Sequence, residues 1–288
     1  DSFPNETIVI QGMIDPTARL NALKTGQIDA ATLDALTVGE AEASGLTVLR
    51  EIYQWAGLHI SDRQGSLVPA LADVRVRQAI NMAFDRDAIL EAIYQGEGVV
   101  TEQVSHPEGS AYEATLNDTY PYDLDEARRL IAEAGYADGF DVEIPSWAPI
   151  SALVNPMIIQ QLGELNIRAT EVPLQNTTAL GDYLSGRFAL YYFPITTSRD
   201  PIFDVEATYT QWNVFRVNDS ELSPMLEAAK TLRGEEAEEN FRNINRFAVE
   251  EAWFVPWAHL YLLVGLGSAD LVPENTGQLG TPNLIDFK

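Results

Sequence analysis

The alternation of strand-like and helix-like segments constrains the fold of this chain more than any other feature. Residues 7–14 form an apolar run that predicts a buried strand. Asp15 can cap a helix with Pro16 in its first turn, and Gly26 can end that helix. Residues 28–33 then resume an extended run. A strand–helix–strand unit of this kind predicts an α/β fold.

The stretch from residue 73 to residue 89 predicts a pair of helices. Asp73 can cap the first helix, and Asp85 or Asp87 can cap the second, which Gly96 and Gly98 would stop. The first helix has an apolar face with helical spacing, made of Val76, Ala79, Ile80, Ala83 and Phe84. The arginines of this stretch are predicted to form a solvated face with local ion pairs to the neighbouring aspartates; they are Arg75, Arg77 and Arg86.

Further helices and strands follow the same patterns. Residues 47–61 are rich in β-branched and aromatic side chains and predict a strand. An amphipathic helix is predicted within residues 123–140, with Ala127, Leu130, Ile131 and Ala134 facing inward. The remaining predictions are a strand in 141–147, a helix leading into a strand in 155–174, a short helix and a strand in 182–195, and two helices in 220–257.

Composition excludes several functions. The net charge of −25 repels phosphate backbones and anionic membrane surfaces, so neither nucleic acid nor membrane is an expected partner. The absence of cysteine excludes disulfides and thiolate chemistry. The histidines at 59, 106 and 259 lie far apart and form no metal-binding motif. There is no GxSxG, P-loop or HExxH pattern, although the 43 carboxylates leave a chance acidic dyad open.

Six segments together resemble the extracytoplasmic solute-binding proteins of family 5, which serve peptide, nickel and related ABC importers. The most distinctive is "ADVRVRQAINMAFDRDAI". The others, in the family's order, are "TARLNALKTGQIDAATL", "YPYDLDEARRLIAEAGYADGF", "IIQQLGELNI", "LSGRFALYYFP" and "NINRFAVEEAWFVPW". The resemblance extends over essentially the whole chain.

The resemblance implies an α/β, two-lobed clamshell like the type II periplasmic binding proteins. Residues 1–70 would form a segment of lobe one, residues 71–252 lobe two, and residues 253–288 the return to lobe one. Full-length members of the family are longer and carry a signal peptide, which is not visible in this chain. We therefore expect the sequence to be the C-terminal part of such a protein, with lobe one incomplete.

The resemblance also indicates where a ligand would bind. Peptide binders of the family hold the peptide's amino group with an acidic residue about four positions before the proline of a turn. Counting back from Pro201 places Thr197 there, or Ser198 if one residue is skipped. This amine anchor is therefore missing. Asp200 matches a turn residue, whereas Arg199 offers a guanidinium that can hold a carboxylate or phosphate. The alternative for Arg199 is an ion pair with Asp200 or Asp204.

Aromatic residues are further candidates for ligand contact because they supply apolar walls and stacking faces. Trp55 and Trp212 are candidates by position, with core packing as the alternative, and Asn213 begins a further family element. Tyr191 and Tyr192 alternate across a strand, so that one faces the cleft and the other the core; Tyr192 is the preferred candidate for the cleft. Trp253 and Trp257 are expected in the core or at the junction of the lobes.

The function implied is non-catalytic capture of a small solute and its delivery to a membrane permease. The solute would be a peptide, an opine-like compound or another polar or anionic molecule. We expect an extracytoplasmic, periplasmic monomer without a cofactor, whose partners are the solute and the permease subunits of an ABC transporter. The alternatives are a nickel or metal-chelate binder of the same family, an enzyme, and a sensory or chaperone-like clamshell.

Overall fold

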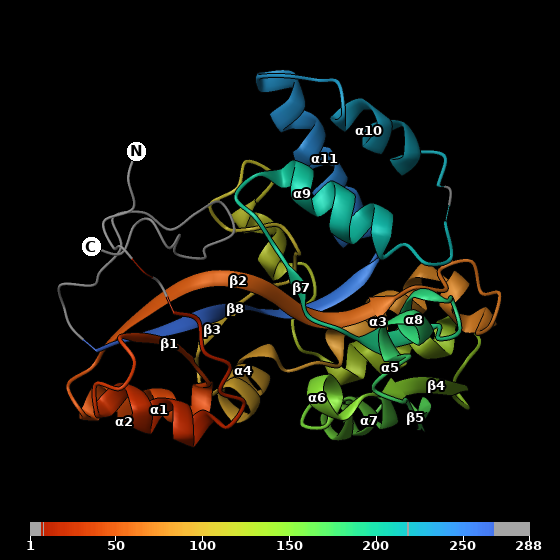
Figure 1. Ribbon diagram of the computed structural model, residues 1–288. Coiled ribbons are helices and arrows are strands. Elements are labelled where there is room, and N and C mark those ends of the chain that lie inside the picture. The colour runs from red at the N-terminus through yellow and green to blue at the C-terminus, as the bar shows by residue number, and fades with distance from the viewer. Residues whose placement is uncertain (1–6, 8, 218, 268–288) are drawn as a thin grey trace.

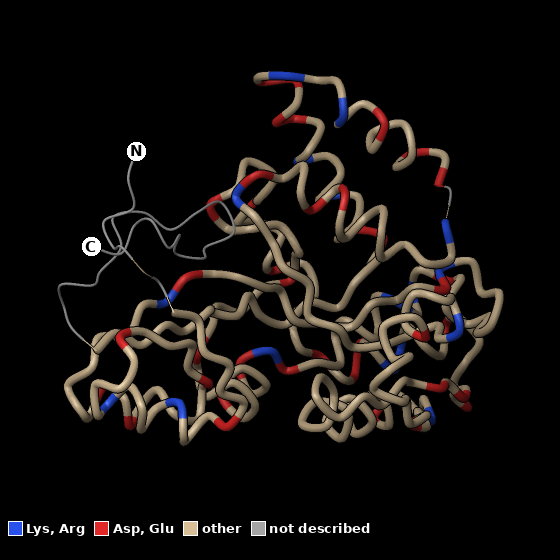
Figure 2. Tube along the Cα trace, in the orientation of Figure 1, with Lys and Arg blue, Asp and Glu red and all other residues tan. Residues whose placement is uncertain are grey.

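The computed structural model describes residues 7, 9–217 and 219–267, and a long antiparallel ribbon runs through the middle of the molecule (Figure 1). Its strands are β2 (Thr47–Ile60) and β8 (Phe254–Leu266), which pair along nearly their whole length. β8 carries no charged side chain, and charged positions are concentrated in the helices and loops around the ribbon (Figure 2). The ribbon is most deeply buried in residues 55–60 of β2 and 254–259 of β8.

Short strands extend the ribbon into a six-stranded sheet. The main order is β1-β8-β2-β6, with β3 also paired to β8 and β7 also paired to β2, all antiparallel. The bounds of these strands are Ala30–Leu33 for β1, Gly98–Val100 for β3, Leu190–Tyr192 for β6 and Ile195–Thr196 for β7. A separate parallel pair consists of β4 (Asp141–Ser146) and β5 (Arg168–Pro173).

Helices cover both faces of the ribbon. One face packs against α3 (Val74–Met82), α5 (Leu124–Glu133) and α7 (Asn155–Gly163), together with β4. The opposite face packs against a mainly aromatic cluster that includes α10 (Leu222–Ala229) and α11 (Glu235–Glu250). The remaining helices are α1 (Pro16–Lys24), α2 (Ala35–Ala43), α4 (Arg86–Tyr94), α6 (Ala148–Ser151), α8 (Ala179–Leu184) and α9 (Pro201–Asp204), and single turns or irregular helices cover Pro69–Ala72, Ala114–Asp118 and Val205–Gln211.

The predicted helix starts are confirmed by their caps. Asp15 accepts a hydrogen bond from the Ala18 amide at 2.7 Å and begins α1. Asp73 accepts from the Arg75 amide at 2.9 Å and begins α3. Asp85, rather than Asp87, caps α4. These caps agree with the sequence because a side-chain cap depends on residues only two or three positions apart.

The buried strand predicted for residues 7–14 is wrong. Residue 7 and residues 9–15 have no regular structure, and no described strand pairs with them. Val9 is 82% exposed, Ile10 83% and Ile14 98%. An apolar run becomes a buried strand only where a neighbouring strand takes its backbone hydrogen bonds and another layer covers its side chains. The extended run predicted for residues 28–33 contains β1, and the helix α2 follows it at residues for which no element was predicted.

Two of the three arginines in the signature segment are buried, which corrects the prediction of a solvated face. Arg75 does pair with Asp73 at 2.5 Å. Arg77 and Arg86, however, are only 4% and 6% exposed. The interior here contains backbone carbonyls, and an arginine with several donors can bond to more than one of them.

The contacts of these buried arginines join α3 and α4 to the start of β8. Arg77 donates to the carbonyls of Glu251 at 2.9 Å and Leu71 at 3.0 Å. Arg86 donates to the carbonyls of Pro256 at 2.9 Å and Tyr120 at 3.0 Å. The signature segment is therefore a structural clamp on the ribbon. The predicted boundaries of the lobes, at residues 70 and 252, stay a prediction, and residues 268–288 of the last range lie outside the described residues.

None of the helices in the described part of the chain is both long and apolar enough to cross a lipid bilayer.

Candidate functional site

The loop between β6 and α9 runs alongside β2 and carries three of the predicted ligand residues. β7, in the middle of this loop, pairs with β2 through Thr196 opposite Gln54 and Ile195 opposite Trp55. The Thr197 amide continues this pairing by donating to the Tyr53 carbonyl at 3.0 Å. The sheet therefore fixes the position of the loop up to residue 197.

Thr197 is completely buried beside a carboxylate. Its hydroxyl oxygen lies 3.1 Å from Oδ1 of Asp204 and 3.2 Å from the carbonyl oxygen of Val104. Burial raises the pKa of Asp204 well above its ordinary value, against hydrogen bonds from the Thr197 hydroxyl and from the backbone of Ser198 and His106. Asp204 is therefore a buried structural group that holds the Thr197 loop against the segment of Val104 and His106.

Arg199 is the point where three segments of the chain meet. Its guanidinium pairs with Glu51 on β2 at 3.0 Å and with Glu108 at 2.6 Å. These two glutamates correct the alternative prediction of Asp200 or Asp204 as the partner, because Asp200 caps α9 through the Ile202 amide and Asp204 bonds Thr197. Arg199 holds the pKa of the Glu108 carboxyl below its usual range.

Trp55 and Trp212 lie on the same face of the ribbon. Trp55 is fully buried and Trp212 is 8% exposed, and the ring of His59 lies between them, 4.7 Å from Trp55 and 5.7 Å from Trp212. They belong to the aromatic cluster that packs on the side of α10 and α11. The structure therefore brings these two predicted residues together.

Tyr192 lies on the opposite face. Its ring stacks on Trp257 with centroids 5.4 Å apart, and its hydroxyl lies 3.1 Å from that of Tyr94. Tyr191 points toward Trp212 instead, at 6.2 Å. The alternation of the two tyrosines is as predicted, but the preferred candidate is separated from the two tryptophans by the sheet. Trp257 is fully buried, as the sequence predicts for the core.

Asn213 holds a turn together with an arginine that the sequence did not single out. Its Oδ1 accepts from Arg63 at 2.8 Å and from the Val217 amide at 3.2 Å. Arg63 in turn lies over the ring of Trp253, 3.7 Å from its centroid. Burial lowers the pKa of Arg63 to about 9. Sequence reasoning also missed Glu51 and Glu108, because their roles depend on partners far away along the chain.

Comparison with known proteins identifies the family. The sequence model described as "Bacterial extracellular solute-binding proteins, family 5 Middle" matches residues 4–214. The chain belongs to this family.

Relatives and solved structures agree with this assignment. Heme-binding protein A of Haemophilus influenzae is 25% identical over 97% of this chain and 52% of its own length. Di/tripeptide-binding protein 3 of Pseudomonas aeruginosa is 39% identical over 54% of this chain and 30% of its own length. The periplasmic binding protein DppA of Helicobacter pylori, solved with the peptide STSA, superposes with a TM-score of 0.78 at 21% identity, covering 96% of this chain and 55% of that one.

The chain thus spans about half the length of the heme-binding relative that it matches. The structural match confirms the predicted fold class, that of the type II periplasmic binding proteins, to which the DppA fold belongs.

The histidines of this family 5 protein offer no shared metal site within the described residues. Burial lowers the pKa of both His59 and His259 to about 3, and lowers that of His106 as well. The Nε2 atom of His59 lies 2.9 Å from the Phe193 carbonyl oxygen, within hydrogen-bond distance. No group of three or more His, Cys, Asp or Glu side chains gathers in the part of the chain that the structure describes. Neutral buried histidines of this kind act as packing residues.

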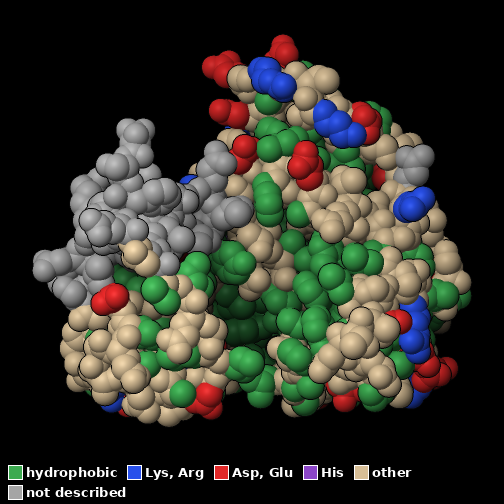
Figure 3. All heavy atoms as spheres, viewed as in Figure 1, with side chains coloured by type: hydrophobic (Ala, Val, Ile, Leu, Met, Phe, Trp, Pro, Cys, Tyr) green, Lys and Arg blue, Asp and Glu red, His purple; other side chains and the backbone are tan. Residues whose placement is uncertain are grey.

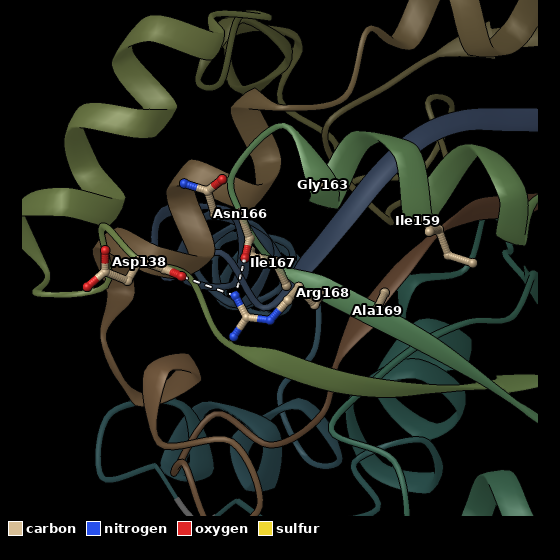
Figure 4. A pocket seen from close by; sticks show the side chains of 7 residues that line it. All are labelled: Asp138, Ile159, Gly163, Asn166, Ile167, Arg168 and Ala169. Carbon is tan, nitrogen blue, oxygen red and sulfur yellow. Dashed lines mark hydrogen bonds between the residues drawn. The ribbon is translucent and has the colours of Figure 1, made fainter.

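A surface pocket of about 330 Å³ lies away from these residues, between α7 and β5 (Figure 4). Its main polar side chain is Arg168, which pairs with Asp141 at 2.6 Å and donates to the Asp138 carbonyl at 3.1 Å. The Asp138 carboxylate points away from Arg168 in Figure 4. Because Arg168 is already paired, the pocket is a poor candidate for a solute site.

Proposed function

We propose that this chain belongs to the periplasmic substrate-binding component of an ABC importer, which captures a small solute between two lobes and delivers it to the permease. The observation that carries the proposal is the family match over residues 4–214, together with a shared fold over 96% of the chain. Clamshell closure on a solute is how such a fold couples binding to recognition by a partner. The protein would act without catalysis and without a cofactor.

The proposed lobe boundaries place both strands of the ribbon in lobe one, with α3, α5, α7 and β4 of lobe two packed against them. Residues 1–70 and 253–288 would contribute to lobe one, and residues 71–252 to lobe two. β2 and β8 are the long strands that run between α1 and α2 at one end of the molecule and the β4–β5 pair at the other (Figure 1).

The proposed solute is a peptide, an opine-like compound or another molecule with an anionic group. Arg199 supports this because its guanidinium can hold a carboxylate through two hydrogen bonds. The Glu108 side chain that pairs with it is 64% exposed, and exposed ion pairs contribute only about 0–1 kcal/mol. A solute carboxylate can therefore replace Glu108 at small cost. Trp212 and Asn213 follow the irregular helix Val205–Gln211, which continues α9, and complete the proposed contacts.

Calorimetry on the intact protein tests this proposal. The panel consists of dipeptides, an opine and a neutral sugar, with mass spectrometry of any solute that co-purifies. We expect a carboxylate-bearing solute to bind, and Arg199→Met to weaken that binding at least tenfold. The matched control is Arg187→Met. This variant removes a different surface arginine, whose acidic partner, Asp182, lies 3.9 Å away. Absence of binding by every class of solute would overturn the proposal.

A further inference from the structure

β4 lies beside β6 in space, and the segment after β5 contacts the residue that follows β4. Trp147 directly follows β4, Phe193 directly follows β6, and Asn176 comes shortly after β5. In open parallel α/β sheets, ligands bind in the crevice outside the carboxyl ends of the strands, and β4 and β5 are such a parallel pair. The loop that carries Arg199 leaves from the same edge, since it begins at Phe193.

Aromatic contacts join these strand ends into one rigid group. The ring of Tyr183 on α8 lies 6.5 Å from Trp147 and 5.2 Å from Phe193. Phe193 in turn lies 4.4 Å from Trp212. The Trp147 indole nitrogen donates to Oδ1 of Asn176 at 2.8 Å, which fixes the orientation of both side chains. Aromatic residues held in this way provide binding area at little cost in conformational entropy.

The group is open to the outside on one side. Trp147 and Phe193 are half-buried, and Asn176 is exposed. Leu180 is 49% exposed and stands one helical turn before Tyr183, on the same side of α8. In the space-filling view, hydrophobic side chains gather beside β7 and line a hollow between α4 and α6, the helix that Trp147 precedes (Figure 3). Exposed apolar area of this kind marks a binding surface.

We infer that Trp147, Asn176, Leu180 and Phe193 form an aromatic subsite that receives a flat apolar group of the captured solute, such as an aromatic side chain. The solute's ring stacks against Trp147 and Phe193, and the Asn176 amide, whose oxygen is held by Trp147, presents its Nδ2 hydrogens to a carbonyl or carboxylate beside that ring. The inference rests on the proposed function and specifies the class of solute: one with an aromatic group as well as an anionic group.

The test compares matched probes on the intact protein. Calorimetry measures Ala-Phe against Ala-Gly, and N-acetylphenylalanine against N-acetylglycine. We expect the aromatic member of at least one pair to bind about tenfold more tightly, because burying a phenyl ring against aromatic residues removes a large apolar area from water. Trp147→Ala should abolish this preference, and Trp147→Phe should restore most of it.

A second variant guards against misfolding of the first. Leu180→Ala, at an exposed position, should reduce the preference severalfold, whereas Leu67→Ala, at a leucine 52% exposed elsewhere, should leave it unchanged. Equal binding within each pair, or a preference that survives both Trp147→Ala and Leu180→Ala, overturns the subsite and leaves the proposed function standing. If no solute of any class binds, the proposed function itself fails, and the subsite with it.

Discussion

At the scale of single residues, the buried arginines explain why the signature segment is crowded with charge. Arg86 donates four hydrogen bonds to buried acceptors, and the Glu102 carboxylate lies 3.9 Å away with a side chain only 5% exposed. Burial raises the pKa of Glu102, while Arg86 opposes that shift. A guanidinium in this position serves the backbone and one acid together, and no apolar residue could do both.

Replacing Arg86 with leucine should be strongly destabilising. The substitution leaves the carbonyls of Pro256 and Tyr120 without a donor and the Glu102 carboxylate without a counter-charge. We expect the free energy of unfolding to fall by about 3–5 kcal/mol, as when one partner of a buried ion pair is removed. Urea denaturation followed by circular dichroism measures this loss. Arg128→Leu, on the exposed face of α5, is the control and should cost far less; equal losses would contradict the assigned role.

At the scale of elements, the irregular pairing of β2 and β8 places two backbones very close together. The register shifts between Ala56 and Gly57, where Gly57 faces Pro256. A Cβ atom on Gly57 would lie 2.4 Å from the Val255 carbonyl oxygen and 2.6 Å from the Pro256 Cα. The bulge therefore requires a residue without a side chain, for steric reasons.

Two glycine-to-alanine substitutions should have opposite effects. Gly57→Ala should lower the free energy of unfolding by about 1–3 kcal/mol, because the backbone of β8 must move to accept the methyl group. Gly39→Ala, inside α2 with open space where the new methyl group would lie, should raise it by about 0.5–1 kcal/mol through helix propensity. Thermal and chemical unfolding of both variants gives the comparison. A stabilising effect at Gly57 would mean that the two strands are not so close.

At the scale of the whole molecule, acid should unfold the protein through its buried histidines. His59 and His259 are each 1% exposed, and burial lowers the pKa of each from 6.5 to about 3. Below pH 6.5 these two histidines bind protons in the unfolded chain but stay neutral in the folded chain. Their contribution to the free energy of unfolding is therefore fully present above pH 6.5 and is lost as the pH drops toward 3. Glu102 and Asp204, whose pKa values are raised, act in the opposite sense, because their contribution is lost as the pH rises.

A histidine variant separates these two effects. Between pH 7 and pH 5 the wild-type protein should lose about 2 kcal/mol more unfolding free energy than His259→Gln, since each pH unit below the unfolded pKa costs about 1.4 kcal/mol per buried histidine. Glutamine can keep the hydrogen bond that His259 makes to the Val104 carbonyl. Urea denaturation at pH 7, 6 and 5 supplies the slopes. Parallel slopes for the two proteins would show that His259 does not stay neutral in the fold.

The sequence by itself determined the local structure and, through its motifs, the family. Caps such as Asp15 and Asp73, the apolar face of α3 and the alternation of Tyr191 and Tyr192 all follow from residues a few positions apart. The order of the motifs identified the fold class before any contact was known.

The tertiary structure alone decided which polar groups meet. Arg199 pairs with residues 91 and 148 positions away, and Arg77 with one 174 positions away. Spacing along a chain carries no information about such partners, because they are brought together by the pairing of strands that are themselves distant. The same reason explains why Val9, Ile10 and Ile14 are exposed and why Tyr192 faces away from Trp212. A local pattern states what a segment can bury, and only the assembled neighbours decide whether it does.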